Sequence, residues 1–347
     1  MLRAIIKYTL RYIVPLVISV GLCWVVFRND SLEEMWKLAT IKCDFTWMWL
    51  MLFIEFFSFV FRALRWRIQL NGVGICASFK EVLYSIFGTY GVNIVLPRVG
   101  EVWRCGYIAQ RRSAPFGTVF GTMVADRFAD VIMSILLLSL TLIVSGSEIE
   151  AFIHKYPAGY EAILSLITSP WLWCISVIVI VGVVIFLRCH TDNKIVNKLK
   201  SFAHELWNGF SAIASMPHRG LWLLWTCMLW GCYFMQLVVA FQAFPFTQSL
   251  FSEHGLLVVL ICFTLTTIAL GIPSNGGIGP YQIAMIFGLS LFMPAGLDAE
   301  ATKAFEMDSK TFANLVLTLS TLLMIAVGLW AFIAIAFEKR KANRQMV

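Results

Sequence analysis

The sequence predicts an all-α polytopic integral membrane protein with about six spanning helices and two re-entrant hairpins of opposite orientation, as in an inverted repeat. Composition comes first: 59% of the 347 residues are hydrophobic and 14% are charged, a balance that water-soluble globular proteins do not have. Second, six apolar runs are long enough to cross a hydrocarbon core of about 30 Å, which takes roughly 20 helical residues. Third, two further apolar stretches are interrupted by proline and glycine.

The first apolar run, near 9–27, follows a basic N-terminus and is expected to be a retained helix. A cleaved signal would end in small residues, but Trp24, Phe27 and Arg28 stand in that region. The other spans are expected near 45–61, 116–143, 169–187, 220–244 and 312–337. Together they predict a single transmembrane domain over residues 1–347 with a short basic tail at 338–347.

Lysine and arginine in short loops predict which side of the membrane each loop occupies. Basic segments alternate with acidic or weakly charged ones, so both termini are expected in the cytoplasm, with the chain in a bacterial inner membrane. The basic segments are the N-terminus, 62–80, 98–112, 188–219 and the tail; the others are 28–44, 145–168 and 294–311.

The two interrupted stretches each return to the side from which they start. The stretch 82–96 joins two basic loops, and 255–293 joins two outside loops. We therefore expect re-entrant hairpins at about 78–112 and 255–293, which protein must enclose because irregular backbone is not tolerated in lipid. The alternative for 255–293 is a pair of ordinary helices joined by a glycine-rich turn.

An arginine and an aspartate stand deep in the run 116–143. Arg127 lies eleven residues after Phe116, hence about 17 Å into the helix. Asp130 shares its helical face at i+3, whereas Asp126 projects about 100° away. Two interpretations stay open: a self-neutralising pair that fixes helix packing, or an anion site in which the Arg127 guanidinium grips a phosphate.

The stretch "LPRVGEVWRC" ends the first hairpin and starts a new helical turn. Pro97 and Gly100 break the helix, and Glu101 and Arg104 follow at i,i+3 spacing. Free amides at a helix start favour an anion, and Glu101 is expected to neutralise Arg104 or Arg127. The alternative is that the arginines here, Arg98 above all, are ordinary cytoplasmic anchors.

The cluster "RALRWR" contains Arg62, Arg65 and Trp66. We expect these side chains at the membrane interface, where the arginines reach lipid headgroups. A role in collecting an acidic headgroup is the second interpretation.

The second hairpin contains "GIPSNGGIGPYQ", in which four glycines and two prolines stop a helix. Its amides are expected to face a phosphate or polar headgroup, with hydrogen bonds from three neutral side chains. The candidate residues are Pro273, Asn275, Gly276, Gly277, Gly279, Tyr281 and Gln282.

Neither a cofactor nor a metal site is expected, because no histidine has metal-ligand spacing and no nucleotide motif is present. A nucleic-acid partner is not expected either. Glu55, a lone carboxylate inside the second span, is interpreted either as a proton carrier or as the partner of an arginine.

These motifs resemble the lysylphosphatidylglycerol synthase transmembrane-domain family, a flippase-like membrane domain. The similarity rests on a Pro-x-x-Gly-Glu-x-x-Arg stretch, an Arg-x-x-Asp helix and a late Pro…Gly-Gly-x-Gly loop, from about residue 10 to 337. The corresponding residues are Pro97, Gly100, Glu101 and Arg104, then Arg127 and Asp130, then Pro273, Gly276, Gly277 and Gly279, with Asn93, Arg65 and Trp66 also fitting.

The resemblance implies movement of an anionic phospholipid, aminoacyl-phospholipid or glycolipid between leaflets, without the aminoacyltransferase domain of larger members. Many members have a glutamate where this chain has Gln282. That change removes a charge and weighs against a cationic lysyl headgroup and against a proton-coupled step at this position.

The function expected is therefore a lipid translocase and not an enzyme, with membrane lipid and bilayer as partners. A homo-oligomer or an envelope-synthesis partner is compatible with it. The alternatives are an intramembrane transferase with a lipid-phosphate donor and Glu101 or Asp130 as general base, and an accessory subunit of envelope synthesis.

Overall fold

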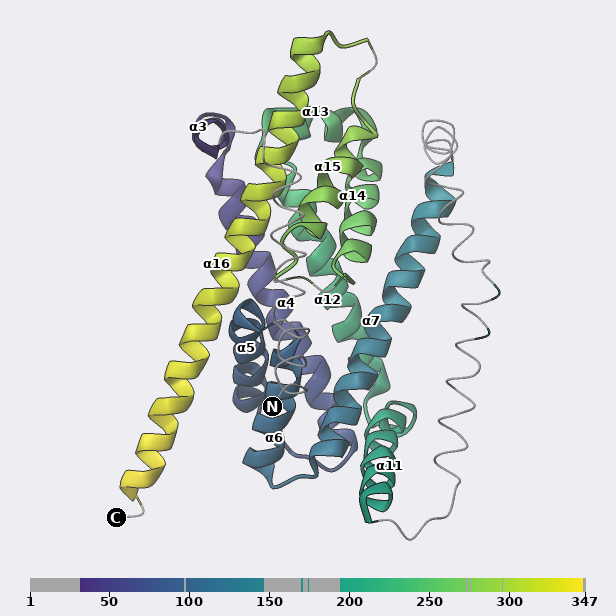
Figure 1. Ribbon diagram of the computed structural model, residues 1–347, viewed down its shortest axis with the longest axis vertical. Helices are drawn as coiled ribbons and strands as arrows, with labels where there is room; N and C mark the ends of the chain where they lie inside the picture. The colour runs from purple at the N-terminus through teal and green to yellow at the C-terminus, as the bar shows by residue number, and fades with distance from the viewer. Residues whose placement is uncertain are drawn as a thin grey trace, which may run out of the picture.

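The computed structural model describes residues 32–96, 98–146, 170, 174, 194–272, 274, 276–294 and 296–345. Eleven helices account for the regular structure of these residues. Four of them are long and apolar enough to cross a membrane, and they run along the length of the molecule in Figure 1. They are α4 (Phe45–Gly72), α7 (Phe116–Val144), α12 (Arg219–Ala240) and α16 (Ala299–Gln345).

These four helices confirm four of the six expected spans. The expected spans 9–27 and 169–187 lie outside the described residues, apart from residues 170 and 174. Two helices are longer than predicted. Helix α4 ends at Gly72 and not near residue 61, because Arg62 and Arg65 in its last three turns are buried in protein. Helix α16 begins at Ala299 and continues to Gln345, so most of the expected tail is helical.

Helical hairpins occupy both predicted positions. Helices α5 (Phe79–Val95) and α6 (Val99–Arg112) pack together in the lower half of Figure 1, whereas α14 (Leu256–Ala269) and α15 (Pro280–Ser290) pack together in the upper half. With 17, 14, 14 and 11 residues, none reaches the roughly 20 residues that cross a bilayer.

The first hairpin is closed by local hydrogen bonds. A capping box between Ser78 and Glu81 starts α5. At the turn, the backbone N–H of Gly100 donates to Oδ1 of Asn93 over 2.8 Å. A Cβ at position 100 would overlap the carbonyl oxygen of Thr89 and Oδ1 of Asn93, so only glycine lets α6 approach α5 this closely.

Glycines also set how this hairpin packs on its neighbour. Gly91 of α5 meets Gly328 of α16, and a Cβ on Gly328 would lie 2.6 Å from the Gly91 Cα atom. Such small residues allow helix backbones to approach closely inside a membrane. The α5–α16 contact therefore places the hairpin along the lower half of α16.

Three helices were not predicted. Helix α11 (Lys194–Ser215) occupies part of the expected basic loop and packs on α7, where Gly121 and Gly209 meet. The others, α3 (Leu32–Lys42) and α13 (Pro245–His254), are short. Helix α13 joins α14 at Gly255 with a bend of 111°.

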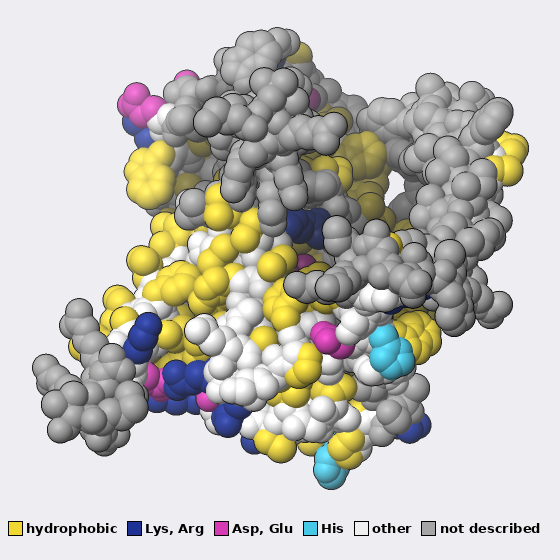
Figure 2. Space-filling view, turned by 60° about the horizontal axis from the view of Figure 1, so that its bottom comes forward, with side chains coloured by type: hydrophobic (Ala, Val, Ile, Leu, Met, Phe, Trp, Pro, Cys, Tyr) yellow, Lys and Arg dark blue, Asp and Glu magenta, His cyan; other side chains and the backbone are white. Residues whose placement is uncertain are grey.

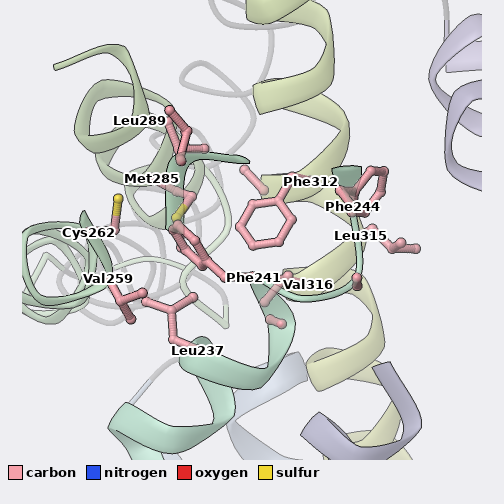
Figure 3. Packing of buried hydrophobic residues seen from close by; sticks show 14 of the residues in the cluster. Leu237, Phe241, Phe244, Val259, Cys262, Met285, Leu289, Phe312, Leu315 and Val316 are labelled. Carbon is pink, nitrogen blue, oxygen red and sulfur yellow. The ribbon is translucent and has the colours of Figure 1, made fainter. Parts of the chain in front are cut away.

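Two hydrophobic cores stabilise the described part. The upper core joins α12, α14, α15 and α16, and its centre contains Phe241 and Phe312 with ring centroids 5.4 Å apart in an edge-to-face arrangement (Figure 3). The lower core surrounds the fully buried Trp66 of α4 and includes Phe87 of α5. The charged residues that α4 buries lie beside this lower core.

Surface charges connect the first hairpin to the end of α16. Glu81 accepts hydrogen bonds from Arg111, at 3.2 Å, and from Arg112, and Arg111 also pairs with Glu338 over 2.6 Å. Figure 2 shows basic and acidic side chains together at one edge of the molecule. Burial raises the pKa of Glu81, but the Ser78 amide and the two guanidinium groups outweigh it and lower the pKa. This contact is therefore present at neutral pH and is lost only as the pH falls through that lowered pKa.

Candidate functional site

Complementary charges face each other across α4 and α7. Nη2 of Arg65 lies 2.7 Å from Oδ1 of Asp126 and 2.9 Å from Oδ1 of Asp130. The side chains of Arg65 and Asp126 have no exposed surface. One turn earlier on α4, Nη2 of Arg62 lies 3.5 Å from Oδ2 of Asp130 and donates to the Tyr233 hydroxyl over 2.8 Å.

The first turns of α6 complete the arrangement. Nη2 of Arg127 lies 2.7 Å from Oε1 of Glu101, and its Nη1 lies 3.2 Å from Oδ2 of Asp130, as their i,i+3 spacing predicts. The Arg127 side chain is 36% exposed, in contrast to the buried Arg65. Arg127 is therefore the arginine through which this cluster reaches the surface of the described structure.

Arg104 is buried without a close partner. Its Nη2 lies 3.7 Å from Oδ2 of Asp126, and its guanidinium stands 4.5 Å from the centre of the Trp66 ring, within cation–π range. Trp66 is held in place by a 3.1 Å hydrogen bond from Nε1 to Oγ1 of Thr122. No described group accepts a hydrogen bond from any nitrogen of the Arg104 guanidinium.

We call these seven charged residues the polar centre: Arg62, Arg65, Arg104, Arg127, Glu101, Asp126 and Asp130. Four guanidinium groups and three carboxylates give it a formal charge of 4 − 3 = +1. Both carboxylate oxygens of Asp126 lie near arginine nitrogens, yet neither accepts an aligned hydrogen bond from a described group. The polar centre is thus a largely buried network in which opposite charges lie close together but several arginine and aspartate atoms have no hydrogen-bond partner among the described residues. Buried polar atoms without partners in a native structure call for an explanation.

The polar centre lies near the middle of α7. Arg127 is eleven residues, or about 17 Å, from the start of this 29-residue helix. Uncompensated charges at such depth are costly and are found facing protein or a water-filled cavity.

The tips of the two hairpins touch. Arg98 begins α6 with a left-handed backbone conformation, φ 64°, and its Nη2 donates to the carbonyl oxygen of Gly271 over 2.9 Å. Arg98 is exposed, as expected of a surface residue, and it also contacts the loop of the second hairpin.

The glycine loop of the second hairpin is fixed to α16. Gly276, Gly277 and Gly279 all have positive φ, between 63° and 92°, which favours glycine. The Gly279 amide donates to Oε1 of Gln282 over 2.6 Å, and Nε2 of Gln282 donates to Oδ1 of Asn314 over 2.7 Å. The Gly279 amide, expected to face a headgroup, is therefore occupied by Gln282.

The polar centre and the glycine loop remain separate groups. Among the residues that the structure describes, no hydrogen bond or ion pair joins 276–282 to the polar centre, and a hydrogen bond between Arg98 and Gly271 joins the two hairpins. Tyr281 packs against the upper core. Pro97, Pro273 and Asn275 lie outside the described residues.

The interface positions expected for Arg62, Arg65 and Trp66 are wrong, since all three are buried. The reason is that Asp126 projects away from the helical face of Arg127, as expected, and points toward α4 and α6, where it lies near Arg65 and Arg104. The sequence contains a signal for this pairing: arginines at i,i+3 on one span and aspartates at i,i+4 on another present matching charges. Tyr233 and Asn314 have no comparable signal.

The fold and this site define a multi-pass membrane protein with a buried, charged centre between a short helical hairpin and two long helices. The chain belongs to the lysylphosphatidylglycerol synthase TM region family, whose model matches residues 12–305, so the family expectation is confirmed. A curated relative, UPF0104 membrane protein PH1989 of Pyrococcus horikoshii, is 23% identical over 306 residues, covering 82% of this chain and 87% of the relative. No solved structure matches the chain.

Proposed function

We propose that the protein is a lipid translocase that carries an anionic phospholipid headgroup between the leaflets of a bacterial inner membrane. The observation that supports this most strongly is the polar centre, which contains one more guanidinium group than carboxylates. A phosphodiester carries one negative charge and balances that excess. Arginine suits this task because its planar donor pair matches two phosphate oxygens.

Arg127 is the first phosphate ligand in this proposal, because it is the partly exposed arginine of the polar centre. Glu101 and Asp130 hold it when no lipid is bound, and the phosphate takes the place of Glu101. Arg104 then supplies donors that no described protein group uses. The same carboxylates compete for the guanidinium groups afterwards, which allows the lipid to leave while its acyl chains stay in the bilayer.

The two hairpins are re-entrant in this proposal and enter from opposite faces, with both chain termini in the cytoplasm. Their positions in opposite halves of the molecule and the Arg98–Gly271 contact between their tips support this arrangement (Figure 1). Short helices that meet between long ones are typical of transporter sites near the bilayer midplane. The polar loops then face protein and not lipid, as the lack of water in the bilayer requires.

The preferred substrate is a phospholipid with a net charge of −1. A lysylated phosphatidylglycerol carries two ammonium groups and one phosphate, hence a net positive charge, which the excess positive charge of the polar centre repels. Phosphatidylglycerol, or a glycolipid joined through a phosphodiester, meets the requirement.

Exchange in liposomes tests the proposal. Protein is reconstituted with labelled phosphatidylglycerol or a labelled phosphate-free glycosyl diacylglycerol, and an impermeant reductant reports the label in the outer leaflet. Wild-type protein should exchange only the phospholipid. Arg127→Gln should slow exchange by about tenfold or more, because a charge-assisted hydrogen bond contributes about 1.5–3 kcal/mol.

Equal exchange of both lipids, or unchanged exchange by a folded Arg127→Gln protein, would contradict the proposal. A new covalent lipid product in the same vesicles would favour the transferase instead. No exchange together with a stable protein partner would favour the accessory subunit.

A further inference from the structure

Glu55 is a buried carboxyl outside the polar centre. It lies in α4, its residue is 6% exposed, and its Oε2 has no hydrogen-bond partner among the described residues. The sequence left open whether it pairs with an arginine. In the described part of the chain, the buried carboxylates Asp126 and Asp308 each have a basic partner within 3 Å, whereas Glu55 forms no ion pair.

The polar groups around Glu55 come from α16 and from α15 of the second hairpin. Helix α16 presents the Ser320 hydroxyl to it as a hydrogen-bond partner, and α15 places the phenol of Tyr281 within electrostatic range. Tyr281 is the second residue of α15, which begins directly after the glycine loop of the second hairpin. A movement of that hairpin therefore changes the environment of the Glu55 carboxyl.

The charged groups near this part of α4 are otherwise engaged. Helices α5 and α12 contribute Tyr90 and Tyr233, which face Arg62, and α7 contributes the two aspartates of the polar centre. Among the described residues, no ion pair connects Glu55 with α11. Along α4, Arg62 follows Glu55 by seven residues, which is two helical turns, about 10.5 Å, on the same face.

We infer that Glu55 is a proton-binding site that sets the charge of the lipid site. This inference rests on the proposed function. A proton taken from water leaves Glu55 neutral, so the polar centre keeps its excess charge of +1 and binds a phosphodiester anion. Return of the proton to water leaves a carboxylate, whose negative charge balances the excess and releases the lipid.

The size of the effect is estimated from the axial separation of Glu55 and Arg62 along α4, about 10.5 Å. Two unit charges about 10 Å apart at an effective dielectric constant of about 20 change a binding constant roughly tenfold. The affinity for a monoanionic phospholipid should thus fall about tenfold as the pH rises through the titration of Glu55. Glu55→Gln, which resembles the protonated side chain, should bind the lipid tightly at every pH.

The first measurement concerns the proton alone. Infrared difference spectra of the full chain in zwitterionic vesicles, titrated from about pH 5 to about pH 9, report protonated carboxyl groups in an apolar environment. The wild type should show a carbonyl band that disappears on titration and is missing in Glu55→Gln. Glu253→Gln, which changes an exposed glutamate, is the matched control and should leave the band intact.

The second measurement is binding of labelled phosphatidylglycerol to the same proteins in a neutral detergent across that pH range. A tenfold loss of affinity in the wild type and in Glu253→Gln, absent in Glu55→Gln, supports the inference. The same band in Glu55→Gln, or the same pH dependence of binding, overturns it. A wild type that shows the band but binds no phospholipid at any pH refutes the proposed function and leaves Glu55 as a proton site.

Discussion

Arg104→Gln is expected to slow lipid exchange strongly while leaving the protein about as stable as the wild type. The substitution removes a guanidinium group whose nitrogens donate no hydrogen bond to any described group. It also removes the excess positive charge of the polar centre. The loss of a charge-assisted contact with the phosphate corresponds to a decrease of about 10- to 100-fold in exchange.

Stability should change little for two opposing reasons. The substitution loses a cation–π contact with Trp66, worth about 0.5–2 kcal/mol. It also removes a buried charged group with unused donors, whose burial costs about 1–3 kcal/mol of folding free energy. The midpoint of thermal unfolding in detergent measures the balance.

Arg111→Gln is the matched control, because Arg111 lies on the same helix but pairs with Glu81 and Glu338 at the surface. It should exchange lipid at the wild-type rate. If Arg104→Gln exchanges lipid as fast as this control, the unpartnered guanidinium has no part in transport.

Arg65→Gln is expected to have the opposite profile, with a large loss of stability. Arg65 is buried and lies within 3 Å of both Asp126 and Asp130, so its removal leaves buried carboxylates without their closest cation. Removing one partner of a buried ion pair typically costs about 3–5 kcal/mol. A lowered unfolding midpoint and a reduced yield of folded protein report this loss.

Arg67→Gln provides the comparison on the same helix. The Nε of Arg67 donates to the carbonyl oxygen of Ala77, and no ion pair of Arg67 is found among the described residues. Its replacement should lower stability by about 1 kcal/mol, the usual contribution of a single hydrogen bond. Equal stability of Arg65→Gln and Arg67→Gln would mean that the α4–α7 ion pairs do not hold the two helices together.

Much of the fold could be predicted because a bilayer imposes simple requirements on length and polarity. The apolar runs marked α4, α7, α12 and most of α16, and the proline and glycine breaks marked the positions of both helical hairpins. The local pairing of Arg127 with Asp130 followed from helical spacing alone. The ends of α4 and α16 could not be predicted, because charged residues that usually mark a loop continue the helix there.

The contacts between distant segments were harder to predict. The positive-inside rule treats arginines at the end of an apolar run as surface residues, which led to the wrong position for Arg65. Their burial depends on carboxylates sixty residues away in sequence, and only the relative position of α4 and α7 shows which charges meet. The hydrogen bonds that Gln282 forms with Gly279 and Asn314 likewise depend on how α15 packs on α16.

Native mass spectrometry with competing lipids tests the central claim most directly, namely that one unbalanced guanidinium charge selects a monoanionic phosphodiester. Wild-type protein is equilibrated with equal amounts of phosphatidylglycerol and a phosphate-free glycosyl diacylglycerol before release from the detergent. Wild-type protein should retain phosphatidylglycerol in preference to the glycolipid, whereas Arg104→Gln should retain neither lipid in preference to the other. Equal retention of the two lipids by the wild type, or the same preference in both proteins, would contradict it.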